Sequence, residues 1–483
     1  MPFSIHKKMV AFALGLLLAA SANAGQAPGR ADAPDIPITS HDRVYLSDQT
    51  SNTVSVVDPA ANKLLGVIRL GDPTPGNLSP LYKGQLLVHG MGFSPDHRTL
   101  VVVSVGSNSV ALIDTQTNRV KHIAYVGRAP HEAFFTPDGK EVWVTVRGED
   151  FVQLLDGQTY GLTRRIQVPN GPGMTIFSPD GKYGYVCSSF TPETVVIDTK
   201  THQIVGRVKQ VSPFCPDIAA TPDGKQVWFT LKDVGKVQVF NAEPPFAPIA
   251  VLDTGPITNH VNFVRNANGQ FAYITVGGLN EVKVYTTTDH PELVATIPTG
   301  DLPHGLWPSG DGTRIYVGLE NADAVTAIDT RSNKVVATIG SGQSPQGMAY
   351  IPNAVPGGDV TENLSAIGAS GEALHLTLVS VGTGKPQTTV ALNNQGLVDL
   401  LEAAVTGLEA KKPYVLALVN NADGSGLLEP LAKFMTNPAG AAIVVTVGPL
   451  RRAVQGNEGS PRRFLVIAPL NEEKPGAPVQ VQR

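Results

Sequence analysis

Charged residues are scarce in this chain of 483 residues, where Asp, Glu, Lys and Arg together make up 16% and the formal net charge is −4. The chain contains no long basic run, so its sequence gives no electrostatic support for nucleic-acid binding. It has only two cysteines, Cys187 and Cys215, which allow at most one internal disulfide. After the first 24 residues, no apolar segment has the length of a transmembrane helix.

Glycine and proline, by contrast, are abundant, with 49 and 38 residues respectively. This composition favours many short strands joined by tight turns over long helices. The length exceeds that of one ordinary core, so we expect a large domain and a smaller one.

The first 24 residues have the pattern of a secretory signal peptide. Lys7 and Lys8 precede an apolar run from Met9 to Ala20, and Ala22-Asn23-Ala24 forms an A-x-A cleavage site. The alternative is a membrane anchor, but the run is too short to span a bilayer comfortably. We therefore predict cleavage after Ala24, a periplasmic or secreted protein without an integral membrane segment, and a flexible mature N-terminus over residues 25–41.

A short turn motif returns at a nearly constant spacing. It reads SPDH at Ser94, TPDG at Thr136, SPDG at Ser178 and TPDG at Thr221, and it continues as NANG, SGDG and a shortened IPN. Successive copies lie 42 to 45 residues apart, and each unit also holds three further strand-like runs rich in Val, Tyr, Trp and Thr. Four strands in a unit of this length are typical of a β-propeller blade.

The two ends of the repeat region complement each other. The last turn motif follows a single strand, residues 345–353, and the three strands that it lacks begin at Arg43, Thr53 and Leu64. A blade shared between the two ends would close the ring and protect strand edges that could otherwise pair with other chains. The sequence therefore predicts an all-β fold with a seven-bladed propeller over residues 42–353.

The repeats EVWVTVRGEDFVQLLDGQTYG and RIYVGLENADAVTAIDTRSNKVVATIGSG resemble the YVTN-type repeats of exported, YncE-like bacterial β-propeller proteins. They are also similar to the propellers of nitrous oxide reductase, thiocyanate dehydrogenase and the cytochrome d1 nitrite reductases. The resemblance covers about residues 42–353 and implies the propeller fold. It implies no single activity, because this repeat occurs in enzymes, binding modules and surface proteins alike.

A second domain is expected after the propeller. Residues 354–372 are rich in Pro, Gly and Ser and are predicted to form a linker. Residues 373–483 contain five strand-like runs, which predict a small, mostly-β, sandwich-like domain. Within it, GLVDLLEAAVTGL fits either one face of a helix or two short strands.

Four of the eleven histidines return at one position of the repeat. His89, His131 and His304 lie eight residues before the last residue of their turn motifs, and His260 lies one residue before that position. The first strand of a propeller blade is innermost and begins on the face crossed by the connections between blades. We therefore expect these four imidazoles around the mouth of the central channel; the remaining repeats carry Gly173, Pro216 and Gln346 there.

These histidines support two interpretations. Neutral imidazoles suit copper, and nitrous oxide reductase and thiocyanate dehydrogenase bind copper through histidines on this face, so the resemblance implies a copper site at His89, His131, His260 and His304. Those enzymes use more histidines, and this chain has no cupredoxin-like cluster. On the second interpretation no cofactor is present: proline holds the strand entry extended and the imidazole bonds a carbonyl of the neighbouring blade.

Loops after the second strands are expected at the same mouth. Together with the four histidines, we expect Glu132, Arg147, Lys232 and Glu320 to contact a small polar ligand or a periplasmic protein partner. The alternative is a solvated rim of loops without a ligand.

The connection from Gly71 to Val88 is longer than the other crossings between blades. Its prolines predict either a semi-rigid flap in which Tyr82 and Lys83 could touch a ligand, or a surface loop without a role at the mouth. Cys187 and Cys215 are expected on the mouth-side face of adjoining blades, where they either form a disulfide or are two small buried residues.

We therefore predict an exported propeller that binds a ligand or a protein through its histidine-lined mouth. A copper-dependent oxidoreductase is the first alternative. A lactonase-like hydrolase is the second, although nothing in the sequence marks a nucleophile elbow.

Overall fold

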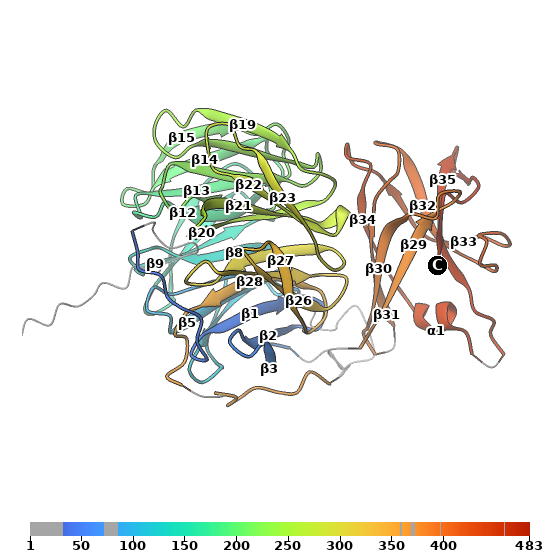
Figure 1. Ribbon diagram of the computed structural model, residues 1–483, viewed down its shortest axis with the longest axis horizontal. Coiled ribbons are helices and arrows are strands. Elements are labelled where there is room, and N and C mark those ends of the chain that lie inside the picture. Colours follow the sequence, from blue (N-terminus) through green and yellow to red (C-terminus); the bar gives the residue numbers. More distant parts are fainter. Residues whose placement is uncertain (1–31, 72–85, 358–359, 369–371, 397, 458) are drawn as a thin grey trace, which may run out of the picture.

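The computed structural model describes residues 32–71, 86–357, 360–368, 372–396, 398–457 and 459–483. Within these residues the chain forms a β-propeller with a smaller β domain beside it (Figure 1). The predicted signal peptide and the flap residues Tyr82 and Lys83 lie outside the described residues. In the described part of the chain, no helix has the length and apolar character needed to cross a membrane.

Seven four-stranded antiparallel sheets form the propeller within the described residues, which confirms the predicted number of blades. Six of them are continuous in sequence, and each begins with its innermost strand. The first two contain β4 (Val88–Phe93), β5 (Thr99–Ser104), β6 (Ser109–Asp114) and β7 (Arg119–Tyr125), then β8 (Pro130–Phe135), β9 (Glu141–Val146), β10 (Phe151–Asp156) and β11 (Leu162–Gln167). The next two contain β12 (Pro172–Phe177), β13 (Tyr183–Ser188), β14 (Glu193–Asp198) and β15 (Ile204–Lys209), then β16 (Ile218–Ala220), β17 (Gln226–Leu231), β18 (Lys236–Asn241) and β19 (Pro248–Asp253). The last two contain β20 (Thr258–Asn266), β21 (Gly269–Val276), the short 3-10 helix η1 (Gly277–Leu279), β22 (Glu281–Thr286) and β23 (Leu293–Pro298), then β24 (Pro303–Pro308), β25 (Arg314–Leu319), β26 (Ala324–Asp329) and β27 (Lys334–Gly340).

The seventh blade joins the two ends of the repeat region, as the sequence predicts. Its strands are β28 (Pro345–Ile351), β1 (Arg43–Asp48), β2 (Thr53–Asp58) and β3 (Lys63–Arg69), in that order from the channel outward. β1 pairs with β28 in antiparallel register, with Tyr45 opposite Ala349 and Leu46 opposite Met348. β28 also contacts β4 and β24, the first strands of its two neighbouring blades, so the ring is closed.

The repeated turn motif holds each first strand against its second. The hydroxyl of Ser94 donates to the Asp96 carboxylate over 2.5 Å, and Thr136 and Ser178 make the same bond to the aspartate two residues later. The fourth position of the motif has a positive φ, which glycine adopts without steric cost. Gly139 has a φ of +70° there, and His97 takes the same conformation at 62°.

Burial falls from the channel outward. Inner strands pack against neighbouring blades on both faces, whereas outer strands have fewer contacts with those blades. Every residue of β4 and β5 is buried, whereas most of β7 is exposed. Large side chains of the second strands, such as Trp143, Trp228 and Tyr316, are fully buried between blades. The core is therefore a set of inter-blade layers around the axis.

The C-terminal domain is β-rich, as predicted, but its strands form one rolled sheet. The sheet has the order β33-β32-β35-β37-β29-β30-β31-β34, and its end strands β33 and β34 contact each other, so it is a nearly closed barrel. The elements are β29 (Ala373–Ser380), β30 (Pro386–Asn394), β31 (Asp399–Val405), β32 (Pro413–Val419), β33 (Glu429–Met435), β34 (Ala442–Gly448), α1 (Leu450–Gln455), β35 (Phe464–Asn471), β36 (Lys474–Pro475) and β37 (Gln480–Gln482).

The ambiguous segment of this domain is the strand β31, and its alternation determines how the domains meet. Leu401, Ala403 and Val405 point into the barrel core. The intervening residues Glu402 and Ala404 are also buried, because strand side chains alternate between the two faces. These two residues face the propeller.

Candidate functional site

The four predicted histidines come together at the mouth of the channel. They lie on the first strands of four blades: His89 on β4, His131 on β8, His260 on β20 and His304 on β24. The ring centroids of His89 and His131 are 4.2 Å apart, those of His260 and His304 are 4.9 Å apart, and those of His89 and His304 are 6.1 Å apart. All four are buried.

Acceptor groups orient two of these rings. Nδ1 of His131 donates to the Gly173 carbonyl over 2.7 Å, so its Nε2 carries the lone pair. Nδ1 of His304 lies 2.7 Å from Oε2 of Glu320. Such partners fix the ring orientation and the tautomer of histidines that bind metals. The bond from His131 to the Gly173 carbonyl is also the contact expected if the histidines only join neighbouring blades and bind no cofactor.

Glu132 lies between His89 and His131. Its Oε1 is 3.5 Å from Nδ1 of His89 and 3.9 Å from Nδ1 of His131. Both Glu132 Oε1 and His89 Nδ1 are buried without a hydrogen-bond partner among the described residues. One donor atom from each of these three residues lies within 4.8 Å of the other two, so His89, His131 and Glu132 could hold a metal ion.

Burial sets the charge of this cluster. It lowers the pKa of His89 to about 3, and it holds the pKa values of His131, His260 and His304 well below the usual range. The imidazoles are therefore neutral, which is the form that binds a metal. Burial also raises the pKa of Glu132 well above its usual value, which favours the protonated acid until a cation binds.

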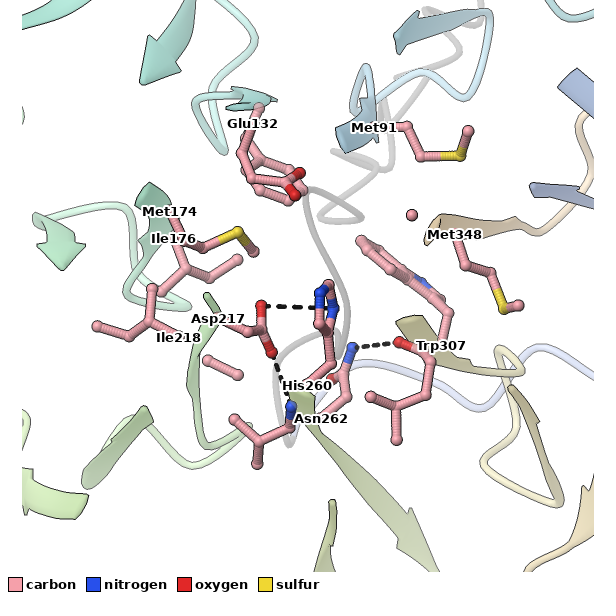
Figure 2. A pocket seen from close by; sticks show the side chains of 15 residues that line it. Met91, Glu132, Met174, Ile176, Asp217, Ile218, His260, Asn262, Trp307 and Met348 are labelled. Carbon is pink, nitrogen blue, oxygen red and sulfur yellow. Dashed lines mark hydrogen bonds and ion pairs between the residues drawn. The ribbon is translucent and has the colours of Figure 1, made fainter. Parts of the chain in front are cut away.

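Two acidic residues share one place in the repeat. Glu132 directly follows His131, and Asp217 directly follows Pro216 at the equivalent position of its own blade. Oδ1 of Asp217 lies 3.8 Å from Nδ1 of His260, and Oδ2 accepts the amide hydrogen of Val261 over 2.7 Å (Figure 2). Sequence reasoning missed Asp217, although its repeat position was a usable signal.

Small residues allow the first strands to converge on these side chains. A Cβ atom at Gly90 would lie 2.1 Å from Oε2 of Glu132 and 2.3 Å from the carbonyl oxygen of His131. Gly347 approaches His89 in the same way, because a Cβ atom at Gly347 would lie 2.4 Å from the carbonyl oxygen of His89. Glycine after the repeated position therefore makes room for the neighbouring blade.

The channel beside the histidines contains a small cavity. Met91, Met174 and Met348 line it together with Trp307, and Glu132 and His260 border it (Figure 2). It leaves about 30 Å³ for the centres of water molecules, enough for about two waters. Methionine fills irregular cores well, and its thioether is also a soft metal ligand.

The predicted cations Arg147 and Lys232 lie at the same mouth. The guanidinium of Arg147 packs over the ring of Phe214 at 5.2 Å and over that of Phe190 at 5.9 Å. The backbone amide of Lys232 donates to the Phe214 carbonyl over 3.2 Å, so both cations adjoin Phe214. Burial lowers the pKa of both groups, and their charges lower the pKa of His89.

The C-terminal domain supplies a residue that the sequence did not indicate as functional. Glu402 of β31 hydrogen bonds with Glu320, and burial followed by this neighbouring charge raises the pKa of Glu402 well above its usual value. Glu320 also accepts from the Gln346 amide. The only sequence signal was one acid inside the apolar run LLEAAV.

Apolar and polar contacts hold this domain over the mouth. Ala404 and Ala441 form a buried cluster with Ile257 and Leu302 of the propeller. The Asn321 side-chain amide donates to the Thr389 carbonyl over 3.2 Å. The histidine cluster therefore lies between the two domains rather than at an open rim.

The structure also contains a disulfide between Cys187 and Cys215, with Cα atoms 6.0 Å apart. Ser189 and Cys187 both contact the Cys215 carbonyl, and Gly173 lies directly beside it. The bridge thus ties together the blades that follow His131.

Comparisons with known proteins support the fold. The YncE-like β-propeller family model matches residues 10–355. Hydrazine synthase from Kuenenia stuttgartiensis is similar at 20% identity with a TM-score of 0.51, over 63% of this chain and 99% of that one. A functionally unknown protein from Desulfotomaculum acetoxidans DSM 771 is similar at 14% identity with a TM-score of 0.55, over 64% of this chain and 98% of that one. A dihydro-heme d1 dehydrogenase, NirN, in complex with DHE is similar at 13% identity with a TM-score of 0.47, over 86% of this chain and 78% of that one.

No curated protein matches the sequence. The family model covers well over half of the chain, including all seven blades. The chain therefore belongs to the YncE-like β-propeller family.

Proposed function

We propose that this chain is an exported small-ligand-binding protein whose site is a transition-metal centre in the mouth of the propeller. The observation that carries the proposal is the group of His89, His131 and Glu132, with donor atoms within 4.8 Å of one another and two of them buried without a hydrogen-bond partner among the described residues. A buried polar atom without a partner costs about 1–3 kcal/mol, and a bound cation would satisfy both.

The same geometry favours a small ligand over a protein partner. Among the described residues, the C-terminal domain packs on the mouth through Glu402 and Ala404, so this domain already occupies part of the surface that a second protein would use. The propeller supplies the metal-binding side chains, and the C-terminal domain packs over them.

Export is supported by two features. The first 24 residues have the pattern of a cleavable signal, and the pair Cys187–Cys215 forms a disulfide, which persists mainly in oxidising compartments. N-terminal sequencing of the protein recovered from the periplasm or medium should begin at Gly25, and an uncleaved cytoplasmic product would contradict this part of the proposal.

A copper-dependent oxidoreductase is the second candidate. The observation that favours it is the cavity in which the thioethers of Met91, Met174 and Met348 line the same space as His260 and Glu132, since thioether and imidazole ligands both suit copper. When bound, copper would supply one-electron chemistry. Copper is therefore the metal to test first.

The test is a metal analysis of the purified full-length mature protein. We expect one copper ion per chain after dialysis against limited copper, and at least a tenfold loss of affinity in Glu132→Gln and His131→Ala. His290→Ala, at an exposed turn far from the mouth, is the matched control and should bind like the wild type. Circular dichroism checks that each variant is folded. A folded wild-type protein that binds neither copper nor zinc stoichiometrically would refute the metal centre.

A further inference from the structure

We infer that the covered mouth binds a small anion with two acceptor oxygens, a carboxylate or an oxoanion, between Arg147 and Lys232. This inference rests on the proposed function, because it assigns the ligand class of the same site. It depends on different residues from the metal centre, so each can fail separately.

The first observation is two positive charges without a counterion. Among the described residues, Arg147 has ring contacts with Phe190 and Phe214, and the backbone amide of Lys232 donates to the Phe214 carbonyl. Within the described part of the chain, neither side chain forms a hydrogen bond or an ion pair with an acid. A charge withdrawn from water is costly unless it is paired, so the two cations favour an anion from solution.

In the part of the chain that the structure describes, the neighbouring Arg128, unlike Arg147, has an ion-pair partner and a hydrogen-bond acceptor for its guanidinium. It lies in the crossing before β8, where its Nε is 3.7 Å from Oε1 of Glu149 and its Nη2 donates to the Gly148 carbonyl over 3.0 Å. Its side chain is 75% exposed. Arg147 is half-buried, yet within the described residues its guanidinium has none of these polar partners.

The second observation is the way in which Phe214 brings the two cations together. Its ring lies 5.2 Å from the guanidinium carbon of Arg147, while its carbonyl accepts the amide hydrogen of Lys232 over 3.2 Å. Aromatic faces hold a guanidinium without using its N–H groups. Arg147 therefore keeps its donors available for a bidentate acceptor, and Lys232 adds a second positive charge nearby.

The nearby acids do not replace the missing counterion. Glu320 is engaged by His304, Gln346 and Glu402. The Lys232 charge acts on both Glu320 and Glu402, but neither carboxylate comes within ion-pair distance of Lys232 among the described residues. A pair of acids that bond each other shares a proton and offers less negative charge than two free carboxylates.

The test titrates the full-length, metal-free mature protein with sodium acetate and sodium sulfate by calorimetry, at constant ionic strength set with sodium chloride. We expect saturable binding of at least one anion, and the one that binds more tightly identifies the carboxylate or the oxoanion class. Arg147→Gln and Lys232→Met should each weaken this binding at least tenfold. Arg128→Gln removes a paired charge of the same sign and should bind like the wild type.

A melting experiment keeps the inference testable if a variant binds too weakly for calorimetry. The anion should raise the melting temperature of the wild type and of Arg128→Gln, and it should leave that of Lys232→Met unchanged. Glu132→Gln separates the two proposals, because it should lose copper while keeping the anion. The inference would be overturned if neither anion bound saturably, or if Arg128→Gln and Arg147→Gln bound the anion equally well.

Discussion

The disulfide between Cys187 and Cys215 should make a large contribution to the stability of the propeller. The two cysteines are separated by 28 residues and both are fully buried. In the chain-entropy treatment, closing a loop of this length in the unfolded state removes about 12 cal/mol/K, which corresponds to about 3.6 kcal/mol at 25 °C. Reduction leaves the folded contacts in place, so the loss should come mainly from the unfolded state.

The assay is guanidinium unfolding followed by tryptophan fluorescence, with and without reductant. All three tryptophans, Trp143, Trp228 and Trp307, lie in propeller strands, so the signal reports this domain alone. With a slope of about 6 kcal/mol/M, reduction should lower the midpoint by about 0.6 M. Cys187→Ala with Cys215→Ala should lower it at least as much and should not respond to reductant.

Two results would refute this reasoning. The first is a thiol titration of the denatured, unreduced protein that finds two free thiols per chain. The second is a transition that does not move when the wild type is reduced, because the bridge would then add nothing to the free energy of unfolding.

Three further predictions follow from the site and from the closed ring. Gly90→Ala should reduce copper affinity at least tenfold in a competition titration, since the new Cβ would lie 2.1 Å from Oε2 of Glu132; an unchanged affinity would contradict the placement of this acid. Burial raises the pKa of Asp48 to about 8, so the folded state holds a proton that the unfolded state releases at lower pH, and stability should fall as the pH rises from about 4 through 8. Asp48→Asn should therefore show a smaller loss of melting temperature between pH 6 and pH 9 than the wild type. An equal loss would exclude Asp48 as a source of the pH dependence of stability. Ala404→Arg should overpack the interface with Leu302, destabilise it by about 1–3 kcal/mol and speed proteolytic separation of the domains. An unchanged digestion rate would argue against this contact.

The sequence by itself determined the ring of blades. A motif such as TPDG at Thr136 is a local device, in which a hydroxyl bonds an aspartate and glycine takes a positive φ, so each copy can be recognised without its neighbours. The single strand ending near Asn353 and the three beginning at Arg43 showed how the ring closes, because an incomplete blade leaves unpaired edges. The repeat register also placed His89, His131, His260 and His304 on the same face.

Only the tertiary structure decided what surrounds those histidines. Glu402 belongs to a strand that is 98 residues beyond His304 in sequence, and neither periodicity nor composition relates the two. The rolled sheet presents Glu402 and Ala404 outward because Leu401, Ala403 and Val405 fill the barrel, and the position of that barrel depends on contacts across the domain interface. Repeated local bonds give a fold that can be deduced from one unit, whereas the charge and enclosure of a site depend on which distant side chains are buried together.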